Sequence, residues 1–261
     1  MVVPALRLAH GDADQRRAVI FERLREWGHV SVSALSSDLG VTEMTIRRDL
    51  RRLTADGLAT LVHGGARLAR RVPTEFGVRA VRQAAEKRRI GQALAARLEG
   101  AGMIGIDAGT TALEVALHLP GDHAGTVVTH SVPVLSAMLQ RPNAHTIGVG
   151  GDLLVENQVM VSAASLRLLE NMRLNVFVLG ANGIDARGVY VHTAFELDIK
   201  RAYIKASDEV VLVIDSSKTL SHAPVRICGL ERITEIVTDA PLPTGVQAVV
   251  DAVGGRTVLA I

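Results

Sequence analysis

Residues 42–65 read TEMTIRRDLRRLTADGLATLVHGG, and this stretch decides the fold of the N-terminal part of the chain. Thr42 can cap a helix and Gly57 can end it, so a helix of about four turns fits between them. Apolar residues recur in it at helical spacing and form one stripe: Ile46, Leu50 and Leu53. The stretch therefore predicts a helix that packs one face on another element and exposes a charged face.

The exposed face of this helix is rich in arginine, with four arginines among residues 47–52. Arginine side chains bind phosphates and guanine edges, and the start of a recognition helix approaches the floor of the groove. We therefore expect DNA contacts from seven residues of this helix and its cap: Thr42, Met44, Thr45, Arg47, Arg48, Arg51 and Arg52. A charged face that is only solvated is the alternative, and the helix alone leaves both open.

The flanking segments favour DNA binding. Residues 16–27 have an amphipathic pattern through Ile20, Leu24 and Trp27, which predicts a helix. Ser31 can cap a second, shorter helix that carries Leu35 and Leu39 and ends at a turn at Gly40. Residues 58–68 alternate around the turn His63-Gly64-Gly65, which predicts a two-stranded wing whose tip lies along DNA. These segments together predict a compact winged helix-turn-helix domain.

Residues 31–66, SVSALSSDLGVTEMTIRRDLRRLTADGLATLVHGGA, resemble the winged helix-turn-helix of the DeoR family of bacterial transcription regulators. The specific part is the TIRRDL core followed by the HGG turn. The resemblance implies DNA contacts for six residues: Thr45, Arg47, Arg48 and Arg51 in the helix, and His63 and Gly64 in the wing. Asp49 lies beside the apolar stripe, so we expect it to pair with an arginine or a cap instead of approaching DNA.

Length and composition fit a two-domain regulator. The chain has 261 residues, is 48% hydrophobic and carries a net charge of +2. Residues 1–73 hold 12 arginines against 8 acidic residues, so the positive charge is concentrated there. The single cysteine, Cys228, excludes an internal disulfide framework and fits a reducing compartment. We see no secretion signal and no apolar run of membrane-spanning length, so we expect a cytoplasmic protein with no membrane role.

Two domains are expected: a winged helix-turn-helix domain over 1–73, with its core at 14–71, and an α/β effector-binding domain over 74–261. Pro73 marks the boundary, and residues 74–98 read as one long linker helix. Short apolar runs then alternate with helical segments, and they predict seven strands at 103–106, 126–128, 146–149, 175–179, 209–214, 235–237 and 256–260. This pattern is typical of a mainly parallel, Rossmann-like sheet covered on both faces.

Polar and small residues follow five of these strands. They lie in the segments 107–111, 129–131, 150–151, 180–183 and 215–218. In an open α/β sheet, ligands bind beyond the carboxyl ends of the strands, so a ligand site is expected there. The segment Asp107 to Thr111 is the best phosphate candidate, because Gly109 permits close approach and Thr110 and Thr111 offer hydroxyls and N–H groups at a helix start. A simple tight turn is the alternative.

Other residues could complete this site. Lys218 could neutralise a bound anion, while Glu196 and Lys200, four residues apart, could form a helical ion pair or reach ligand hydroxyls. Because the chain lacks nucleotide-binding loop motifs and its histidines His130 and His192 are isolated, no cofactor and no metal are expected.

Residues 75–243 resemble the effector domain of the DeoR family, which shares its fold with ribose-5-phosphate isomerase. The resemblance implies a crevice for a phosphorylated sugar, lined by Asp107, Gly109, Thr110, Thr111, Gly151, Glu196 and Lys218. We add three neighbours in the same motifs: His130, Ser131 and Lys200. The chain departs from the family at His130, where Asn is frequent, and at Leu153-Leu154, where a basic residue is frequent.

The sequence thus predicts a transcription regulator that is not an enzyme: a repressor of carbohydrate-metabolism genes. It would bind a double-stranded DNA operator as a homodimer or higher homo-oligomer, and a phosphorylated sugar effector would release it. One alternative is a sugar-phosphate isomerase with a DNA-binding appendage, in which Asp107 or Glu196 works with Lys218. Another is a larger domain that has lost ligand binding and only dimerises.

Overall fold

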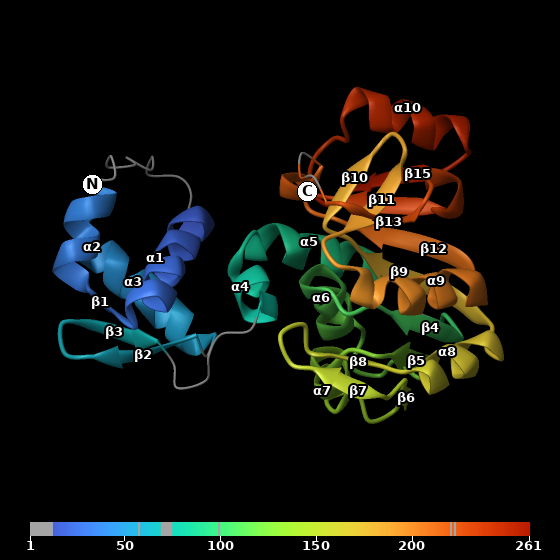
Figure 1. The fold of residues 1–261 in the computed structure, drawn as a ribbon, viewed down its shortest axis with the longest axis horizontal. Coiled ribbons are helices and arrows are strands. Elements are labelled where there is room, and N and C mark those ends of the chain that lie inside the picture. The colour runs from blue at the N-terminus through green and yellow to red at the C-terminus, as the bar shows by residue number, and fades with distance from the viewer. Residues whose placement is uncertain (1–12, 57, 69–74, 99, 220, 222) are drawn as a thin grey trace. The chain divides into compact units, whose positions relative to one another are not determined.

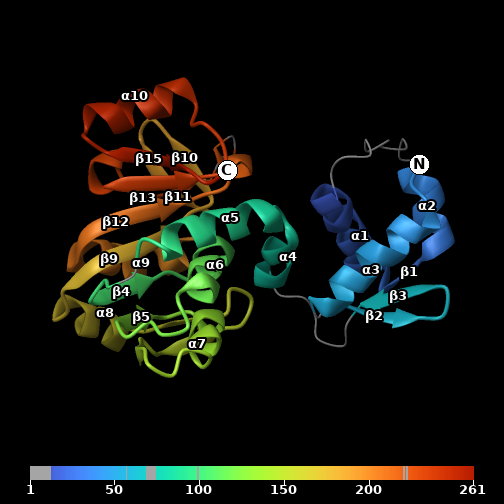
Figure 2. The same cartoon turned by 180° about the vertical axis from the view of Figure 1, so that it is seen from behind.

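The computed structural model describes residues 13–56, 58–68, 75–98, 100–219, 221 and 223–261. The chain divides into two compact units, Met1–Ala84 and Ala85–Ile261, and each is described by itself (Figures 1 and 2). The expected boundary at Pro73 lies outside the described residues. Within the described part, no helix combines the length and the apolarity that crossing a membrane requires.

The first unit contains the expected helices and wing, in blue and cyan in Figure 1. Its elements are α1 (Ala13–Trp27), β1 (His29–Ser31), α2 (Val32–Leu39), α3 (Glu43–Ala55), β2 (Ala59–Val62), β3 (Gly65–Leu68) and α4 (Glu75–Val81). The three strands form one sheet in the order β1-β3-β2. The winged helix-turn-helix prediction is confirmed.

The core of the first unit includes the predicted stripe of α3, because Ile46, Leu50 and Leu53 are fully buried. The prediction for Trp27 is wrong: its side chain is 58% exposed, and the guanidinium of Arg23 lies 5.6 Å from the centre of its ring. Trp27 is the last residue of α1, and Phe21 fills the core instead.

The sequence did not predict strand β1, which pairs antiparallel with β3 and places Val30 opposite Ala66. Gly65 makes this pairing possible, since an added Cβ would lie 2.0 Å from the Val30 carbonyl oxygen. A glycine that looks like part of a simple turn therefore also permits the close approach of a third strand.

The predicted long helix over 74–98 is wrong. The described part of this stretch forms two helices, α4 and α5 (Ala84–Ala95), separated by Gln83 in a left-handed conformation with φ of 52°. Val78 and Val81 of α4 belong to the core of the first unit. Apolar residues of α4 therefore pack in the core of the first unit, whereas Ile90 and Leu94 of α5 pack in the core of the second unit. The break at Gln83 separates the two helices.

The second unit is built on a seven-stranded parallel sheet, and all seven predicted strands are present. The sheet order is β15-β14-β12-β9-β4-β5-β6. The strands are β4 (Met103–Ile106), β5 (Thr126–Thr129), β6 (His145–Gly148), β9 (Leu174–Gly180), β12 (Ser207–Val213), β14 (Glu235–Thr238) and β15 (Arg256–Leu259). The predicted α/β class is confirmed.

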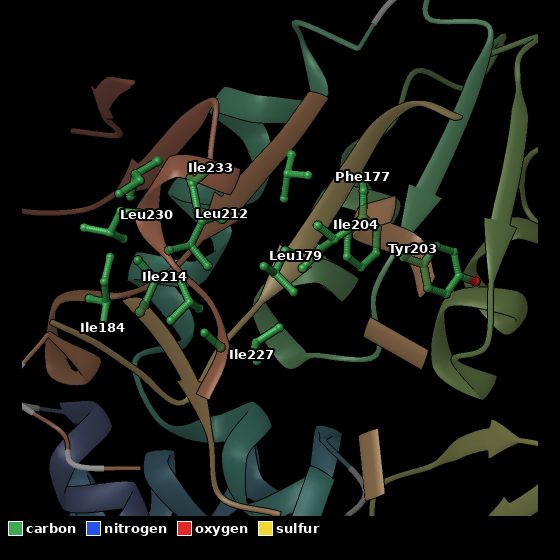
Figure 3. Packing of buried hydrophobic residues seen from close by; sticks show 14 of the residues in the cluster. Phe177, Leu179, Ile184, Tyr203, Ile204, Leu212, Ile214, Ile227, Leu230 and Ile233 are labelled. Atoms are coloured by element: carbon green, nitrogen blue, oxygen red, sulfur yellow. The ribbon is translucent and has the colours of Figure 1, made fainter. Parts of the chain in front are cut away.

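Helices cover both faces of this sheet (Figures 1 and 2). One apolar cluster joins the sheet to α5, α6 (Thr110–His118) and α7 (Val132–Met138). The other joins it to α8 (Ala163–Glu170), α9 (Leu197–Ala206) and α10 (Thr244–Ala252). Strand β9 shows the alternation, because Val178 enters the first cluster while Phe177 and Leu179 enter the second (Figure 3).

Two small antiparallel sheets were not predicted. One pairs β7 (Asp152–Leu154) with β8 (Val159–Val161), and the other has the order β10-β11-β13, with β10 at Gly183–Asp185, β11 at Gly188–Val191 and β13 at Val225–Cys228. These strands lack the alternation of strand and helix that identifies the strands of the main sheet, because among the described residues no α-helix separates them from the strand before them in the chain. Short 3₁₀ turns complete the unit at Ala194–Glu196, Ser216–Lys218 and Leu230–Arg232.

Candidate functional site

The start of α3 is fixed by its predicted cap. The Thr42 hydroxyl accepts a hydrogen bond from the Thr45 backbone N–H at 3.3 Å. The preceding turn has Gly40 at φ of 66°, a left-handed conformation that suits glycine. The helix ends at Ala55 with Asp56 as its C-cap, whereas the predicted terminator Gly57 lies outside the described residues.

The arginines of α3 divide into two pairs. Arg47 forms an ion pair with Glu43 at 3.3 Å, and Arg52 forms one with Asp56 at 3.7 Å. Arg48 and Arg51 are exposed and have no hydrogen bond or ion pair within the described residues. These two guanidinium groups are therefore the ones available to an external anion.

Asp49 points to the inside of the unit, as the sequence predicts. The Arg16 Nε group donates to Asp49 Oδ2 at 2.6 Å and Nη2 donates to Oδ1 at 3.3 Å, and both side chains are buried. This bidentate pair ties α1 to α3 and directs the carboxylate away from the arginine-rich face.

Of the other predicted DNA-contacting residues, Thr45 is half-buried in the first turn of α3, and the rest are exposed: Thr42, Met44, His63 and Gly64. Met44 is 73% exposed near the start of α3. His63 and Gly64 occupy the exposed turn between β2 and β3, where Gly64 has φ of 76°. Both the recognition helix and the wing thus present side chains or backbone to solvent.

In the second unit, three predicted residues form one buried charged cluster at the carboxyl ends of the strands. Asp107, after β4, accepts a hydrogen bond from the Gly180 N–H at 2.8 Å and a second from the Lys200 ammonium. Lys200 lies 3.4 Å from Glu196 Oε2, and Glu196 Oε1 accepts from Asn157 Nδ2 at 2.5 Å. The helical ion pair considered for Glu196 and Lys200 is present, and Asp107 extends it.

Burial and pairing act against each other on the pKa values of this cluster. Burial alone would lower the pKa of Lys200, but the carboxylates of Asp107 and Glu196 raise it on balance. Burial alone would raise the pKa of Asp107, but Lys200 and His130 lower it. Both groups are therefore charged at neutral pH, and the charge of Lys200 is already balanced by protein carboxylates.

His130 and Tyr203 adjoin this cluster. The fully buried His130 has Nε2 3.7 Å from Asp107 Oδ1, and its ring centre lies 5.4 Å from that of Tyr203. Burial lowers the pKa of His130 despite the nearby Asp107 carboxylate, so the imidazole is neutral at pH 7. Sequence reasoning missed Tyr203 and Asn157, because a tyrosine on an apolar helix face reads as core and an asparagine in a turn reads as a turn residue.

A second group of predicted residues surrounds the N-terminus of α6. Gly109 is the N-cap and supplies no side-chain hydrogen bond, while Thr110 and Thr111 in the first turn are buried. Lys218 Nζ lies 3.3 Å from Asp215 Oδ2 and donates to the Thr111 hydroxyl at 3.5 Å. A helix start combined with a nearby ammonium group forms a favourable setting for an anion.

Two further predicted effector residues have structural contacts. The Ser131 hydroxyl caps α7 by accepting from the Val134 N–H at 3.3 Å. Gly151 has φ of 156°, and a Cβ there would lie 2.4 Å from the Val161 carbonyl oxygen. Contact of either residue with an effector stays a prediction.

Comparison with known proteins covers both units. Residues 16–72 match the model of the DeoR-like helix-turn-helix domain, and residues 82–240 match that of the DeoR C terminal sensor domain. The chain is 32% identical to the glycerol-3-phosphate regulon repressor of Escherichia coli, over 90% of this chain and 94% of the relative. It is also 32% identical to an uncharacterized HTH-type transcriptional regulator, YgbI of Escherichia coli, over 88% of this chain and 91% of the relative.

A third relative, the L-fucose operon activator of Haemophilus influenzae, is 31% identical over 89% of this chain and 94% of its own length. All three relatives are named as regulators of transcription or of gene groups, so the isomerase alternative is not retained. Among solved structures, ribose 5-phosphate isomerase A of Methanocaldococcus jannaschii aligns with 14% identity and a TM-score of 0.38, over 52% of this chain and 54% of that one, an overlap too weak to carry an argument.

Proposed function

The chain belongs to the DeoR family of transcription regulators, and on this premise we propose that it is a repressor controlled by a phosphorylated sugar. In this proposal, α3 and the wing bind a double-stranded DNA operator. A sugar phosphate binds the larger unit at the α6 N-terminus and releases the DNA.

The observation that carries the DNA part is the division among the arginines of α3. Arg48 and Arg51 are exposed without a partner within the described residues, whereas Asp49 between them is buried against Arg16. A helix that turns its central acidic residue inward and leaves two of its four arginines unpaired in the described part of the chain favours an acidic partner, and DNA presents phosphates and guanine edges to it. We assign Thr42, Met44, Thr45 and the wing residues supporting contacts.

The effector part is supported by the groups around α6. The uncapped helix start favours a phosphate because it contributes partial positive charge, and the Lys218 ammonium, which also pairs with Asp215, can donate a charged hydrogen bond to it. Asp107 and Glu196 lie at the same strand ends and offer carboxylate oxygens to sugar hydroxyls. The relative named glycerol-3-phosphate regulon repressor makes a phosphorylated carbon compound a reasonable first probe.

Specific operator binding in this proposal requires at least two copies of the chain. A single small winged domain buries too little surface for tight, specific binding, and paired domains read two half-sites. We therefore propose a homodimer or a higher homo-oligomer, acting in the cytoplasm where bacterial DNA lies.

The test is to measure binding of the full chain to DNA from upstream of its own gene and its neighbours, at a stated salt concentration. Fluorescence anisotropy is recorded with and without a panel of sugar phosphates. The proposal expects nanomolar to sub-micromolar binding to one segment and release by one compound. Binding that no phosphorylated compound changes would remove the effector part, and the absence of any preferred DNA segment would remove the operator part.

A further inference from the structure

We propose that Asp107, His130 and Tyr203 form a subsite that binds a neutral hydroxyl group of the effector and rejects a carboxylate at that position. This inference rests on the proposed function, in which the phosphate group of the effector binds beside Lys218. It specifies the chemistry of the other end of the same ligand.

The first observation is a concentration of buried polar atoms that lack hydrogen-bond partners within the described residues. They are Asp107 Oδ1, both ring nitrogens of His130 and the Tyr203 hydroxyl. All three side chains are fully buried. Unpaired buried polar atoms are uncommon because each one loses its hydration without compensation, so several in one place indicate a small polar group that completes them.

The second observation is that two of these atoms, His130 Nε2 and Asp107 Oδ1, lie close enough to share one ligand atom, and that the Tyr203 ring adjoins them. His130 Nε2 and Asp107 Oδ1 are 3.7 Å apart, which is too long for a hydrogen bond but allows one oxygen atom to contact both. The Tyr203 ring lies 5.4 Å from the His130 ring and stacks on Phe177 at 4.7 Å. Figure 3 shows the Tyr203 hydroxyl pointing away from the apolar side chains labelled around it.

The third observation is the charge of the surroundings. Asp107 and Glu196 bring two carboxylates against the single ammonium of Lys200, and His130 is neutral. The cluster therefore carries a net negative charge, and its one cation is already bonded to both carboxylates. A ligand carboxylate placed there would be desolvated next to like charges, which is strongly unfavourable.

A hydroxyl group satisfies the same atoms. It donates to Asp107 Oδ1 and accepts from a His130 N–H or from the Tyr203 hydroxyl, which burial keeps protonated by raising the pKa of Tyr203. Asp107 lies three residues before Thr110, the first residue of α6, so a ligand whose phosphate binds the α6 N-terminus can extend towards the cluster. The site thus has a positive end for phosphate and a negative end for hydroxyl.

The test uses isothermal titration calorimetry of the full chain with compounds matched in length. Each polyol phosphate is paired with the aldonic acid phosphate in which the terminal CH₂OH is a carboxylate, beginning with glycerol 3-phosphate and 3-phosphoglycerate. Inorganic phosphate probes the α6 end alone. The expected result is that at least one polyol phosphate binds about tenfold or more tightly than its carboxylate partner, since a site built for a hydroxyl discriminates strongly.

Tyr203→Phe is the main variant, because it removes the hydroxyl and keeps the ring that stacks on Phe177. It should weaken the polyol phosphate several-fold, reduce the preference and leave inorganic phosphate binding unchanged. Tyr190→Phe is the matched control, since Tyr190 is the other tyrosine and bonds to Asp185 away from this cluster. His130→Asn is a second variant, which removes the imidazole contacts and should also reduce the preference for the polyol phosphate. Thermal melting confirms that each variant is folded.

The outcomes separate the two proposals. Equal affinity within every pair of compounds, or a Tyr203→Phe variant that keeps the wild-type preference, would overturn the proposed hydroxyl subsite. Binding of inorganic phosphate in the same experiment would still support the anion site at α6. The unpaired atoms of the cluster would then be explained by a bound water molecule. If neither inorganic phosphate nor any phosphorylated compound binds, the anion site of the proposed function fails and the subsite fails with it.

Discussion

Asp49 and Asp38 show how burial changes the value of an ion pair between an aspartate and an arginine of α1. Asp49 pairs with Arg16 at 2.6 Å with side-chain exposures of 3% and 7%, whereas Asp38 pairs with Arg23 at 2.6 Å with exposures of 50% and 25%. The distances are equal, but only the first pair is shielded from water. The two pairs therefore form a matched comparison within one small unit.

We predict that Asp49→Ala destabilises the first unit by about 3–5 kcal/mol, because it leaves the Arg16 guanidinium buried without a counter-charge. Asp38→Ala should cost about 0–1 kcal/mol, as expected for an exposed pair. Urea unfolding followed by circular dichroism measures both. Similar losses for the two variants would contradict the role given to the buried pair.

The buried His130 side chain should make the free energy of unfolding of the second unit depend on pH. Burial lowers its pKa in the folded chain below the ordinary value of about 6.5, so the unfolded chain binds the proton more readily. Its contribution to stability is therefore complete above about pH 6.5 and is lost as the pH falls below that value. His123, whose pKa burial also lowers, acts in the same direction.

We predict that the free energy of unfolding of the second unit decreases between pH 7 and pH 5, and that His130→Asn makes this decrease smaller while His123 preserves part of it. Thermal melting across this pH range provides the measurement, with the readings at pH 7 to 8 as the reference for each protein. An unchanged slope in the variant would show that His130 is not the titrating group.

For single residues, the sequence predicted a contact correctly where the two contacting residues are close together in the chain. The Thr42 cap could be predicted because its partner, the Thr45 N–H, is three residues away. The contact between Lys200 and Asp107 joins residues 93 positions apart, so only the folded sheet brings them together. Tyr203, in helix α9, was missed for the same reason, because its polar neighbours Asp107 and His130 follow strands β4 and β5 far away in the sequence.

At the scale of elements, the inner parallel strands were predictable because a strand buried on both faces reads as a continuous apolar run, as in β14; the edge strands β6 and β15 are half-exposed and were predicted from the alternation of strand and helix around them. The two small antiparallel sheets and β1 were not, since their strands lie outside the alternation of strand and helix that builds the main sheet, and β1 and β13 depend on partners distant in the chain. The break at Gln83 was missed for another reason: apolar residues continue on both sides of it, and the sequence does not record that they enter different cores.

The break yields a prediction about backbone strain. Gln83 has φ of 52°, which favours glycine over residues with a Cβ. Gln83→Gly should therefore leave stability unchanged or raise it by up to about 1 kcal/mol. Gln92→Gly, the same substitution inside α5, should cost about 1 kcal/mol because glycine weakens a helix interior. Differential scanning calorimetry of both variants tests this, and a loss at position 83 as large as at position 92 would show that the left-handed conformation does not persist in solution.

For the whole molecule, the sequence predicted two units with different chemistry, and the family comparison confirms a DNA-binding part and a sensor part. What it could not predict is how binding in one unit affects the other, because coupling depends on differences between two states of the folded chain. The proposed function requires such coupling. Its size in regulators is about 1–3 kcal/mol, or roughly 5- to 150-fold in affinity.

Coupling between the effector site and the DNA-binding site is reciprocal. If the effector weakens operator binding by some factor, the operator must weaken effector binding by the same factor. Arg48→Ala should lower operator affinity by about 1–3 kcal/mol and leave effector affinity in the absence of DNA unchanged, because Arg48 is exposed and unpartnered within the described residues. Lys218→Ala should do the reverse, raising the effector concentration needed for release while operator affinity without effector stays at the wild-type value.

The measurement is a complete cycle: effector affinity with and without saturating operator, and operator affinity with and without saturating effector, for the wild type and both variants. Arg173→Ala removes an exposed arginine of the second unit that pairs with Asp208; it serves as the control for loss of a surface positive charge and should match the wild type in all four affinities. Effector affinity that is identical with and without operator would rule out the regulator mechanism, even if both ligands bind. A Lys218→Ala variant that responds normally would keep the mechanism and move the phosphate away from α6, because an ammonium group that pairs with the ligand cannot be removed without loss of affinity.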